Sequence, residues 1–318
     1  MRASFVSLML VGTLLGGCRG AEPSSRLGPH SRSTSASVDE VLEREIASLA
    51  DGFEGDVGIF VHDLATNRTA SLHADELFPT ASMIKVPILI GIFDKLERGE
   101  LSWRKPLIYE ARRKYPGEDV LARFQDGAEV SLSELVTFMC TFSDNTASLW
   151  CQELAGGGET INSWLAEHAF ALTRVNSRTS GREEGKQLYG WGQTSPREMA
   201  ALVEGIAQGS ILSSAASAEM LRSLSRSYWT NEALSAIPPD VHSASKQGAV
   251  DASRSEVVWV DAPHGPYVFC VITKHQKDTS WQHDNAGFVL LRRVSQLLWR
   301  HFERAAPWRP GAGADRYF

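Results

Sequence analysis

Strand-forming segments occur near both ends of this chain and leave its middle to helices. Residues 57–61 and 70–72 have the pattern of a strand pair around a Thr-Asn-Arg turn, and residues 256–260 and 267–273 form a second predicted hairpin. The stretch between them, from about residue 75 to residue 240, is largely helical in pattern. We therefore predict an α+β fold, an α/β sandwich in which both termini build one antiparallel sheet, helices flank it and an all-helical lobe is inserted.

Short capping sequences mark several helix boundaries. Residues 37–40, Ser-Val-Asp-Glu, have the form of a capping box that opens an amphipathic helix, and Asp51 and Gly52 are expected to end it. Residues 131–134 and 195–198 have the same form, the second with proline at the first helical position. A last helix is predicted from about residue 285 to residue 304.

The first 18 residues resemble a segment that directs export. A basic residue precedes an apolar run too short to cross a membrane, and Leu-Gly-Gly-Cys at residues 15–18 resembles a bacterial lipobox, whose cysteine becomes lipidated. An ordinary signal peptide, with Cys18 incidental, is the alternative. We predict a flexible tether at residues 19–37, a folded domain at 38–306 and a tail at 307–318. Either way, we expect a periplasmic or cell-envelope protein, held to the membrane only by a lipid anchor at Cys18.

Charge and cysteine content exclude some classes of partner and site. The formal net charge is −6, and it falls to about −9 without residues 1–37, so a nucleic-acid partner is not expected. No CxxC pair, HExxH motif or histidine cluster predicts a metal site. Cys140 and Cys151 are expected on one helix, roughly 16 Å apart and unable to bond, and both are interpreted as small buried apolar side chains.

A serine and a lysine open the most apolar predicted helix. Residues 88–93 are almost uniformly apolar and predict a helix that is buried on nearly all sides. Ser82 and Lys85 are three residues apart at its start, so they share one face at the end where free N–H groups favour negative charge. A buried lysine loses proton affinity, and Lys85 could then deprotonate Ser82. A helix-start serine beside a solvent-directed lysine is the alternative.

Three short polar residues interrupt a second helical region. Ser143, Asp144 and Asn145 are of types that compete with helix backbone and usually occupy caps or turns. The Ser143 hydroxyl could pass a proton to a leaving group, and the Asn145 amide could bind an amide of the substrate. A local turn without chemical function is the alternative.

A third group of residues lies just before the C-terminal hairpin. Lys246 could hold an anionic group of the substrate, with Gln247 and Gly248 beside it. The backbone N–H of Ala249 could join that of Ser82 as an oxyanion hole. A solvated lysine at the start of a strand is the alternative.

The three groups in this order resemble the penicillin-recognising serine hydrolases, above all class A β-lactamases. The pattern reads S-x-x-K, S-D-N and K-x-G, with 61 residues from Ser82 to Ser143 and 103 from Ser143 to Lys246. The resemblance covers about residues 38–305. It implies that Ser82 attacks a lactam carbonyl, Lys85 is the base, Ser143 relays the proton to the departing nitrogen, and Lys246 and Asn145 position the substrate. No cofactor is implied.

Two departures from the family pattern affect the predicted site. Gln247 replaces a hydroxyl residue that helps to bind the substrate carboxylate, and Arg254 is expected to supply that contact instead. The place of the glutamate that activates the deacylating water falls at Thr179, and the nearest carboxylates are Glu183 and Glu184. We take Glu183 as the candidate base if it folds inward. Without such a base we expect a burst of acylation followed by slow turnover.

Two other functions remain open at this level. A D,D-peptidase or transpeptidase acting on peptidoglycan stems would use the same serine, and a binding or sensing protein would keep the fold without turnover. The predicted partner is therefore a small-molecule β-lactam or a stem peptide, bound by a monomer. The length, without a further module, favours a β-lactamase.

Overall fold

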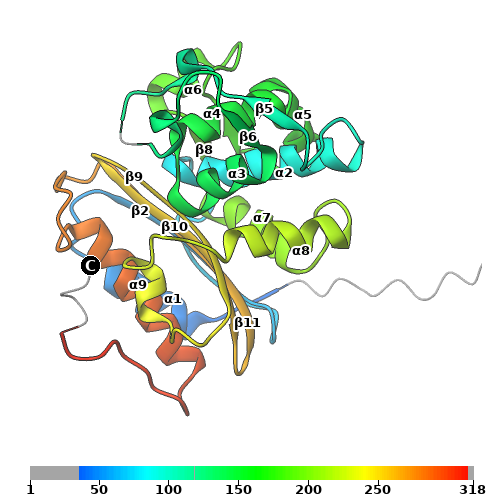
Figure 1. The fold of residues 1–318 in the computed structure, drawn as a ribbon. Coiled ribbons are helices and arrows are strands. Elements are labelled where there is room, and N and C mark those ends of the chain that lie inside the picture. Colours follow the sequence, from blue (N-terminus) through cyan, green and yellow to red (C-terminus); the bar gives the residue numbers. More distant parts are fainter. Residues whose placement is uncertain (1–35, 118, 314–318) are drawn as a thin grey trace, which may run out of the picture. The chain divides into compact units, whose positions relative to one another are not determined.

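One six-stranded sheet forms the centre of the folded domain, in a computed structural model that describes residues 36–117 and 119–313 (Figure 1). Its strand order is β1-β3-β2-β11-β10-β9. All neighbours pair antiparallel except β1 and β3, which are parallel. The strands are β1 (Ser37–Val38), β2 (Asp56–Asp63), β3 (Arg68–Leu72), β9 (Ser243–Val250), β10 (Ser253–Ala262) and β11 (Gly265–Lys274).

The pairing of β2 with β11 joins the two ends of the chain. Phe60 lies opposite Cys270 in this antiparallel register, although the residues are far apart in the sequence. This arrangement confirms the predicted α+β fold with a sheet built from both termini. One boundary differs: residues 245–249, expected just before the hairpin, lie inside β9, which is the edge strand.

Each face of the sheet packs against its own set of helices. Along β10, Val258 and Val260 pack with α1 (Glu40–Ala50) and α9 (Ala286–Phe302), whereas Val257 and Trp259 belong to the core shared with the helical lobe. Figure 1 shows α1 and α9 on one face and the lobe on the other. The strict alternation of a strand therefore separates two apolar cores.

Helix α1 begins differently from the prediction. Asp39, not Ser37, caps it, because Ser37 is already a strand residue opposite Arg68. Ser37, the last residue assigned to the tether, therefore pairs with the sheet. The C-terminal end is as predicted, with Asp51 as the C-cap.

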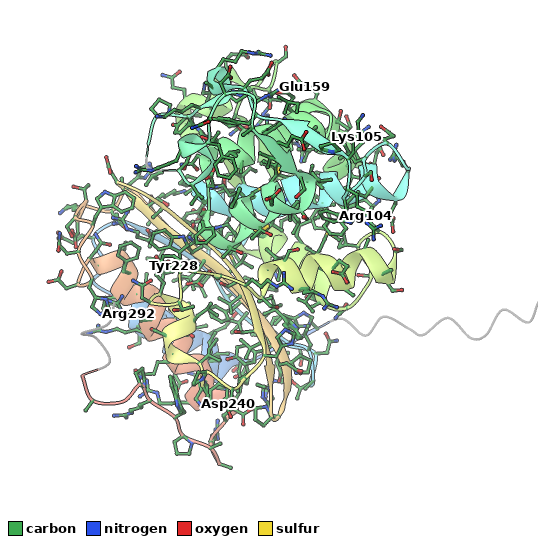
Figure 2. All side chains as sticks on the ribbon, in the orientation of Figure 1. Arg104, Lys105, Glu159, Tyr228, Asp240 and Arg292 are labelled. Carbon is green, nitrogen blue, oxygen red and sulfur yellow. The ribbon has the colours of Figure 1, made fainter. Side chains whose placement is uncertain are left out.

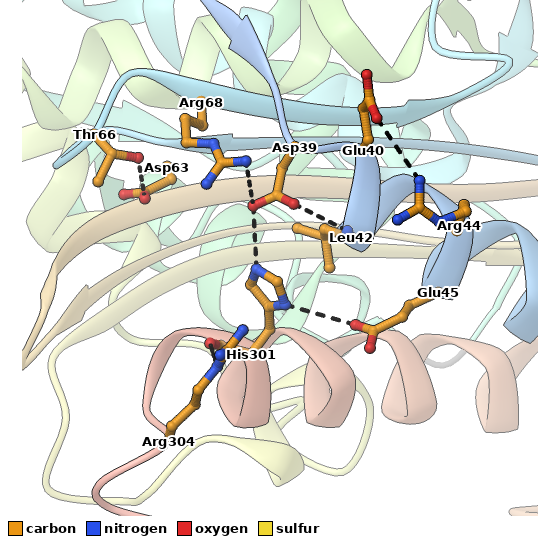
Figure 3. A network of polar contacts seen from close by, with 10 residues as sticks. All are labelled: Asp39, Glu40, Leu42, Arg44, Glu45, Asp63, Thr66, Arg68, His301 and Arg304. Carbon is orange, nitrogen blue, oxygen red and sulfur yellow. Dashed lines mark hydrogen bonds and ion pairs between the residues drawn. The ribbon is translucent and has the colours of Figure 1, made fainter.

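A polar network fixes α1 against α9 and β3 (Figure 3). Asp39 accepts a hydrogen bond of 3.0 Å from the Leu42 N–H through Oδ1. Its Oδ2 lies 3.4 Å from Nη2 of Arg68 and 3.2 Å from Nε2 of His301. The other ring nitrogen of His301 is 3.6 Å from a Glu45 carboxylate oxygen. The first turn of α1 is thus held by charge as well as by its cap.

The lobe on the opposite face is not purely helical, which corrects the prediction of an all-helical lobe. It contains α2 (Lys85–Glu97), α3 (Leu132–Thr137), α4 (Asn145–Leu154), α5 (Gly157–Glu167), α6 (Glu183–Tyr189), α7 (Pro196–Ala207) and α8 (Ser214–Leu224). It also has a three-stranded sheet of β4 (Phe78–Pro79), β8 (Gly192–Thr194) and β7 (Arg174–Val175), and a pair of β5 (Pro106–Ile108) and β6 (Glu129–Ser131). Helix α2 is buried throughout its first nine residues, as predicted.

The two capping boxes in the lobe differ in outcome. Ser131 and Glu134 form a complete box at α3. Ser195 caps α7, with Pro196 in its first turn, but the Glu198 carboxylate instead accepts hydrogen bonds from the N–H groups of Leu172 and Thr173. Glu198 therefore holds the start of β7 rather than closing a box.

Cys140 and Cys151 do not lie on one helix. Cys140 is in a π-helical turn, Phe138–Phe142, and Cys151 is in α4. The break between them is Ser143, whose φ of 62° is left-handed. Both cysteines and Cys270 are free and buried, which confirms their interpretation as small apolar side chains.

Candidate active site

Ser82 and Lys85 are brought together by a tight turn at the start of α2. Residues Ala81–Ile84 form a 3₁₀ turn, in which residues three apart are aligned, and Lys85 is the first residue of α2. Lys85 Nζ lies 3.0 Å from Ser82 Oγ. The Lys85 side chain is completely buried, which excludes the alternative of a lysine that reaches solvent.

Ser143 and Asn145, both in the second motif, contact the same lysine, Lys85. The left-handed backbone of Ser143 ends the π-helical turn, and Asp144 then caps α4 by accepting from the Ala147 N–H at 2.7 Å. Lys85 Nζ lies 2.9 Å from Ser143 Oγ, 2.5 Å from the Ser143 carbonyl oxygen and 3.0 Å from Asn145 Oδ1. The turn expected here therefore exists and directs both polar side chains at Lys85.

Lys246 approaches the opposite side of Ser143 from the edge strand. Its Nζ lies 3.0 Å from Ser143 Oγ and 2.9 Å from the Gln247 carbonyl oxygen, and it also donates to Gln247 Oε1. Lys246 is 1% exposed and lies within β9, so the alternative of a solvated lysine is wrong. The Ser143 hydroxyl consequently bridges two buried amines.

Burial weakens the hold of both amines on their protons. Removal from water lowers the pKa of Lys85 well below the usual value of a lysine, and the nearby charge of Lys246 lowers it further. Burial also lowers the pKa of Lys246 to about 8. Lys85 is therefore able to exist as a neutral amine beside the Ser82 hydroxyl.

Two buried carboxylates hold the Ser143 turn: Asp144 of the second motif and Asp119, which the sequence analysis did not single out. Asp119 accepts hydrogen bonds from the N–H groups of Asn145 at 3.0 Å and Thr146 at 2.8 Å. Asp144 accepts from the Leu121 N–H at 2.8 Å. The segment around residues 119–121 and the second motif are thus locked together. Asp119 is distant in sequence from residues 143–146, so no local pattern predicts that its carboxylate binds their backbone.

Gly248 allows β9 to approach Ser82. A Cβ atom at this position would lie 2.7 Å from the Ser82 nitrogen and 2.7 Å from the Thr80 carbonyl oxygen. The Ser255 hydroxyl donates to that Thr80 oxygen at 3.2 Å and fixes the contact from β10. The backbone of β9 therefore lies directly against the predicted nucleophile, and Ala249 lines the same cavity as Ser82.

Ser82 opens into a cavity of about 500 Å³ with mostly apolar and aromatic walls. Tyr115 and Trp191 meet edge to face with ring centroids 4.9 Å apart. Among the described residues, no aspartate or glutamate lines this cavity. Its lining is Pro79, Ala81, Ser82, Tyr115, Asn145, Leu188, Tyr189, Gly190, Trp191, Ala249, Val250, Ala252, Ser253, Lys274 and His275.

The structure does not bring Arg254 into the site, which corrects the sequence prediction. Its neighbours Ser253 and Ser255 face the cavity and Thr80, so the alternation of β10 points Arg254 to the opposite face. There Arg254 Nη2 donates to the Ser280 carbonyl oxygen at 2.6 Å, and its guanidinium stacks 4.5 Å from the Trp281 ring centroid. Arg254 is also fully buried, so it is not free to reach a substrate.

The predicted inward fold of Glu183 or Glu184 is also absent. Both side chains are exposed at the start of α6, and a Glu183 oxygen accepts from the Gly181 N–H at 3.2 Å. Neither residue lines the Ser82 cavity. Thr179 is buried, and its hydroxyl donates to the Ser177 carbonyl oxygen at 2.9 Å. The loop approaches the cavity through the C-terminal end of α6 instead, with apolar and aromatic side chains.

A second aromatic group adjoins Ser143 and was not predicted. Phe142 and Tyr228 have ring centroids 5.7 Å apart, and Tyr228 and Trp229 are 5.4 Å apart. Trp229 Nε1 donates to the Phe142 carbonyl oxygen at 3.1 Å. Tyr228 is labelled in Figure 2, where the sheet faces the helical lobe. These partly exposed rings come from two separate segments of the sequence, so no local pattern predicts that they form one group.

Behind Lys246 lies a buried pair of carboxyl groups. Glu256 of β10 is opposite Gln247 in the sheet, and its Oε2 accepts from the Ala233 N–H at 2.8 Å. Burial raises the pKa of Glu256 and of Glu232, and for Glu256 the neighbouring Glu232 raises it further. The positive charges that oppose this rise at Glu232 come from Lys246, Arg254 and Arg292 of α9, the last labelled in Figure 2.

Within the part of the chain that the structure describes, no cluster of three or more His, Cys, Asp or Glu residues could hold a metal ion.

Comparison with known proteins gives consistent matches. The family model described as "Beta-lactamase enzyme family" matches residues 41–302. A beta-lactamase of Streptomyces fradiae is 25% identical over 265 residues, which cover 81% of this chain and 85% of that protein. Beta-lactamase SME-1 of Serratia marcescens is 22% identical over 143 residues, covering 44% of this chain and 48% of that protein. The solved structure of PBP-A has a TM-score of 0.76 at 24% identity and covers 85% of this chain and 99% of that one. The last match confirms the predicted fold.

Proposed function

This chain belongs to the beta-lactamase enzyme family, and on that premise we propose that it is a serine hydrolase of the class A type, which opens the β-lactam ring through an acyl-enzyme on Ser82. The observation that carries the proposal is one buried amine, Lys85 Nζ, within 3.0 Å of both Ser82 Oγ and Ser143 Oγ. A nucleophile, its base and a proton relay thereby adjoin a cavity of about 500 Å³.

Acylation begins with transfer of the Ser82 proton to Lys85. Burial lowers the pKa of Lys85, so a neutral amine is available to accept the proton as Ser82 Oγ attacks the lactam carbonyl carbon. The carbonyl oxygen becomes negative at this step. The N–H groups of Ser82 and Ala249 are suited to stabilise it, because β9 lies against the Ser82 backbone at Gly248.

Ring opening then needs a proton on the departing nitrogen. The carbon–nitrogen bond breaks, and the Ser143 hydroxyl gives its proton to the nitrogen while taking one from Lys85, 2.9 Å away. Lys246, 3.0 Å from the same hydroxyl, stabilises the negative charge that Ser143 carries during the transfer. Lys85 returns to the neutral amine, and the acyl group remains on Ser82.

Substrate binding uses groups on both sides of Ser82. Lys246, with Nζ 3.0 Å from Ser143 Oγ, is placed to attract the carboxylate that accompanies the lactam nitrogen. Asn145, whose side chain lines the cavity, is placed to bind the acylamide of the substrate. Gln247 directs its amide oxygen at Lys246 and orients that ammonium group rather than replacing a hydroxyl contact.

Deacylation is proposed to be slow. Hydrolysis of the ester on Ser82 needs a base that activates water, and no carboxylate among the described residues lines the cavity. The Thr179 hydroxyl is not a base near neutral pH, and Glu183 is exposed to solvent. The expected time course is therefore a burst near one equivalent and then a slow steady state.

The proposal is tested by covalent labelling with a fluorescent penicillin. Ser82→Ala is expected to abolish labelling while far-ultraviolet circular dichroism and the melting temperature stay unchanged. Ser223→Ala, a half-buried position of α8 that does not line the cavity, is the matched control and should label like the wild type. Undiminished labelling of Ser82→Ala would refute the assignment of the nucleophile.

A second measurement separates the hydrolase from the related activities. Turnover of a chromogenic cephalosporin beyond one equivalent supports a β-lactamase. Release of D-alanine from a stem peptide at a higher rate would instead identify a D,D-peptidase. Labelling with neither turnover would identify a binding protein.

We also propose export and a lipid anchor at Cys18, which lies outside the described residues. The support is the lipobox-like Leu-Gly-Gly-Cys sequence at residues 15–18. In the described residues, no helix has the length and apolarity to cross a membrane. Metabolic labelling with a radioactive fatty acid should mark the wild type and not Cys18→Ala. Equal incorporation in both would contradict the anchor.

A further inference from the structure

We propose that Ser253 and Lys274 form a subsite for an anionic group on the acyl side chain of the substrate. The inference rests on the proposed function, because it concerns the specificity of the same reaction. Both residues line the cavity that contains Ser82, and neither belongs to the three motifs. The subsite would favour β-lactams whose acyl side chain carries a carboxylate.

The cavity extends away from the side of the leaving group. Its lining includes Asn145, which is placed to bind the acylamide, but does not include Ser143 or Lys246. From Ser82 it continues past Ala249 to the β9–β10 turn and the end of β11. A volume of about 500 Å³ is in the range of cavities that hold drug-sized ligands. The group that fills this extension is therefore the acyl side chain.

Ser253 supplies a polar group without a protein partner. The residue is 2% exposed, and its Oγ makes no hydrogen bond with any described residue. Buried hydroxyl groups are usually paired, because an unmade hydrogen bond is costly away from water. A ligand atom in the cavity would provide the missing partner.

Lys274 supplies the charge at the same place. Ser253 is the first residue of β10 and Lys274 is the last residue of β11, so both lie at the same end of this antiparallel pair. Lys274 Nζ donates to the Leu77 carbonyl oxygen at 3.0 Å and lies 4.3 Å from the Phe78 ring centroid. These contacts fix the ammonium group and leave it protons to donate to a ligand.

The nearby carboxylate of Glu76 does not take up the remaining protons of the Lys274 ammonium group. Glu76 Oε2 lies 3.7 Å from Nζ, beyond hydrogen-bond distance, and the Glu76 side chain is 55% exposed. Such a solvated pair is weak. His275 lines the cavity too, but its Nδ1 lies 2.8 Å from Asp56, and it is more exposed than Lys274. Lys274 is therefore the cation that an incoming carboxylate would meet together with the Ser253 hydroxyl.

The test compares two penicillins that share one nucleus. One carries a phenylacetyl side chain, and the other carries the same side chain with an added carboxylate. The second-order rate constant of acylation is measured for both, and their ratio is the readout. Lys274→Met should lower the ratio of carboxylate to neutral substrate about tenfold, as expected for a lost charge-assisted hydrogen bond. Lys274→Arg should restore most of it.

Three further variants keep the test independent of folding and of general charge. Ser253→Ala removes no hydrogen bond within the described protein, and it should lower the ratio about threefold, the size of one neutral hydrogen bond. Glu76→Gln should raise the ratio, because it frees Lys274. Lys277→Met, an exposed lysine paired with Glu54, is the control and should leave the ratio unchanged.

An equal change for both penicillins in Lys274→Met, or an unchanged ratio in that variant and in Ser253→Ala, would overturn the subsite. Failure of the wild type to form a covalent adduct with either penicillin would instead refute the proposed function.

Discussion

Replacement of Glu256 by glutamine is expected to stabilise the folded protein relative to the wild type, and the difference should grow as the pH rises. Glu256 is fully buried in β10, and burial followed by the proximity of Glu232 raises its pKa to about 8, against 4.5 for a free glutamate. The folded protein therefore keeps a proton that the unfolded chain releases. Because the native state binds more protons over this range, the free energy of unfolding falls with pH from about 4.5 to 8.

The size of the effect follows from the pKa difference. Each pH unit between the two pKa values costs roughly 1.4 kcal/mol, so ionisation of this carboxyl group in the unfolded chain lowers the free energy of unfolding by about a few kcal/mol by pH 8. Glutamine has nearly the same volume, and its carbonyl oxygen can still accept from the Ala233 N–H. Glu256→Gln should therefore lose this pH dependence without leaving a cavity.

Urea unfolding followed by tryptophan fluorescence at pH 5, 6, 7 and 8 measures the effect. The free energy of unfolding of Glu256→Gln relative to the wild type should increase steadily from pH 5 to pH 8. Glu219→Gln, on the exposed face of α8, is the control and should follow the wild type. Parallel curves for Glu256→Gln and the wild type would refute the reasoning, since they would mean that Glu256 is already ionised in the folded state.

The same variant tests the link to the active site. Burial lowers the pKa of Lys246 to about 8, and the Glu256 and Glu232 charges oppose that decrease. Glu256 ionises over the same range as Lys246, near pH 8, so Glu256→Gln lacks a negative charge that the wild type gains there, and the pKa of Lys246 should be lower in the variant. Acylation by an anionic penicillin should then decline at a lower pH than in the wild type. An unchanged pH profile would show that Glu256 does not act on Lys246.

Three other outcomes are expected. Glu183→Gln and Glu184→Gln should each leave the burst and the steady-state rate as in the wild type, because both side chains are exposed outside the cavity; a large fall in either rate would identify a base. Gly248→Ala should reduce penicillin labelling about a hundredfold, because a Cβ atom would lie 2.7 Å from the Ser82 nitrogen; normal labelling would contradict this. Burial opposes ionisation of Asp39, but hydrogen bonds from the Leu42 N–H and from His301 still lower its pKa, so Asp39→Asn should cost less than about 1 kcal/mol at neutral pH. That cost should vanish as the pH falls through the lowered pKa, and a cost that persists at pH 2 would exclude an electrostatic origin.

Local features of the sequence were sufficient to select the proposed nucleophile and its first partner. Ser82 and Lys85 are three residues apart in one short turn, so their contact depends only on the backbone between them. The capping box at Ser131 is predictable for the same reason. The apolar pattern of the terminal segments also determined which residues build the central sheet, because strand periodicity is a property of the segment itself.

Prediction from the sequence was less reliable where the direction of a side chain depends on distant packing. Arg254 follows the third motif closely, yet the alternation of β10 points it to the α9 face. Glu183 is near the expected position of a catalytic glutamate, yet α6 leaves it in solvent. The polar residues around Ser143 indicated a turn, but not the left-handed backbone that places Cys140 and Cys151 in separate elements.

The remaining parts of the site were decided by the tertiary structure. The sheet and the helical lobe together bring Nζ of Lys85 and Nζ of Lys246 within 3.0 Å of Ser143 Oγ. Asp119 supports this cluster, and Ser253 and Lys274 extend its cavity. The sequence by itself thus determined which residue types could do the chemistry, because those contacts are local or recur as motifs. Only the fold decided which charges are buried, paired or turned away, because burial and pairing depend on neighbours that are distant along the chain.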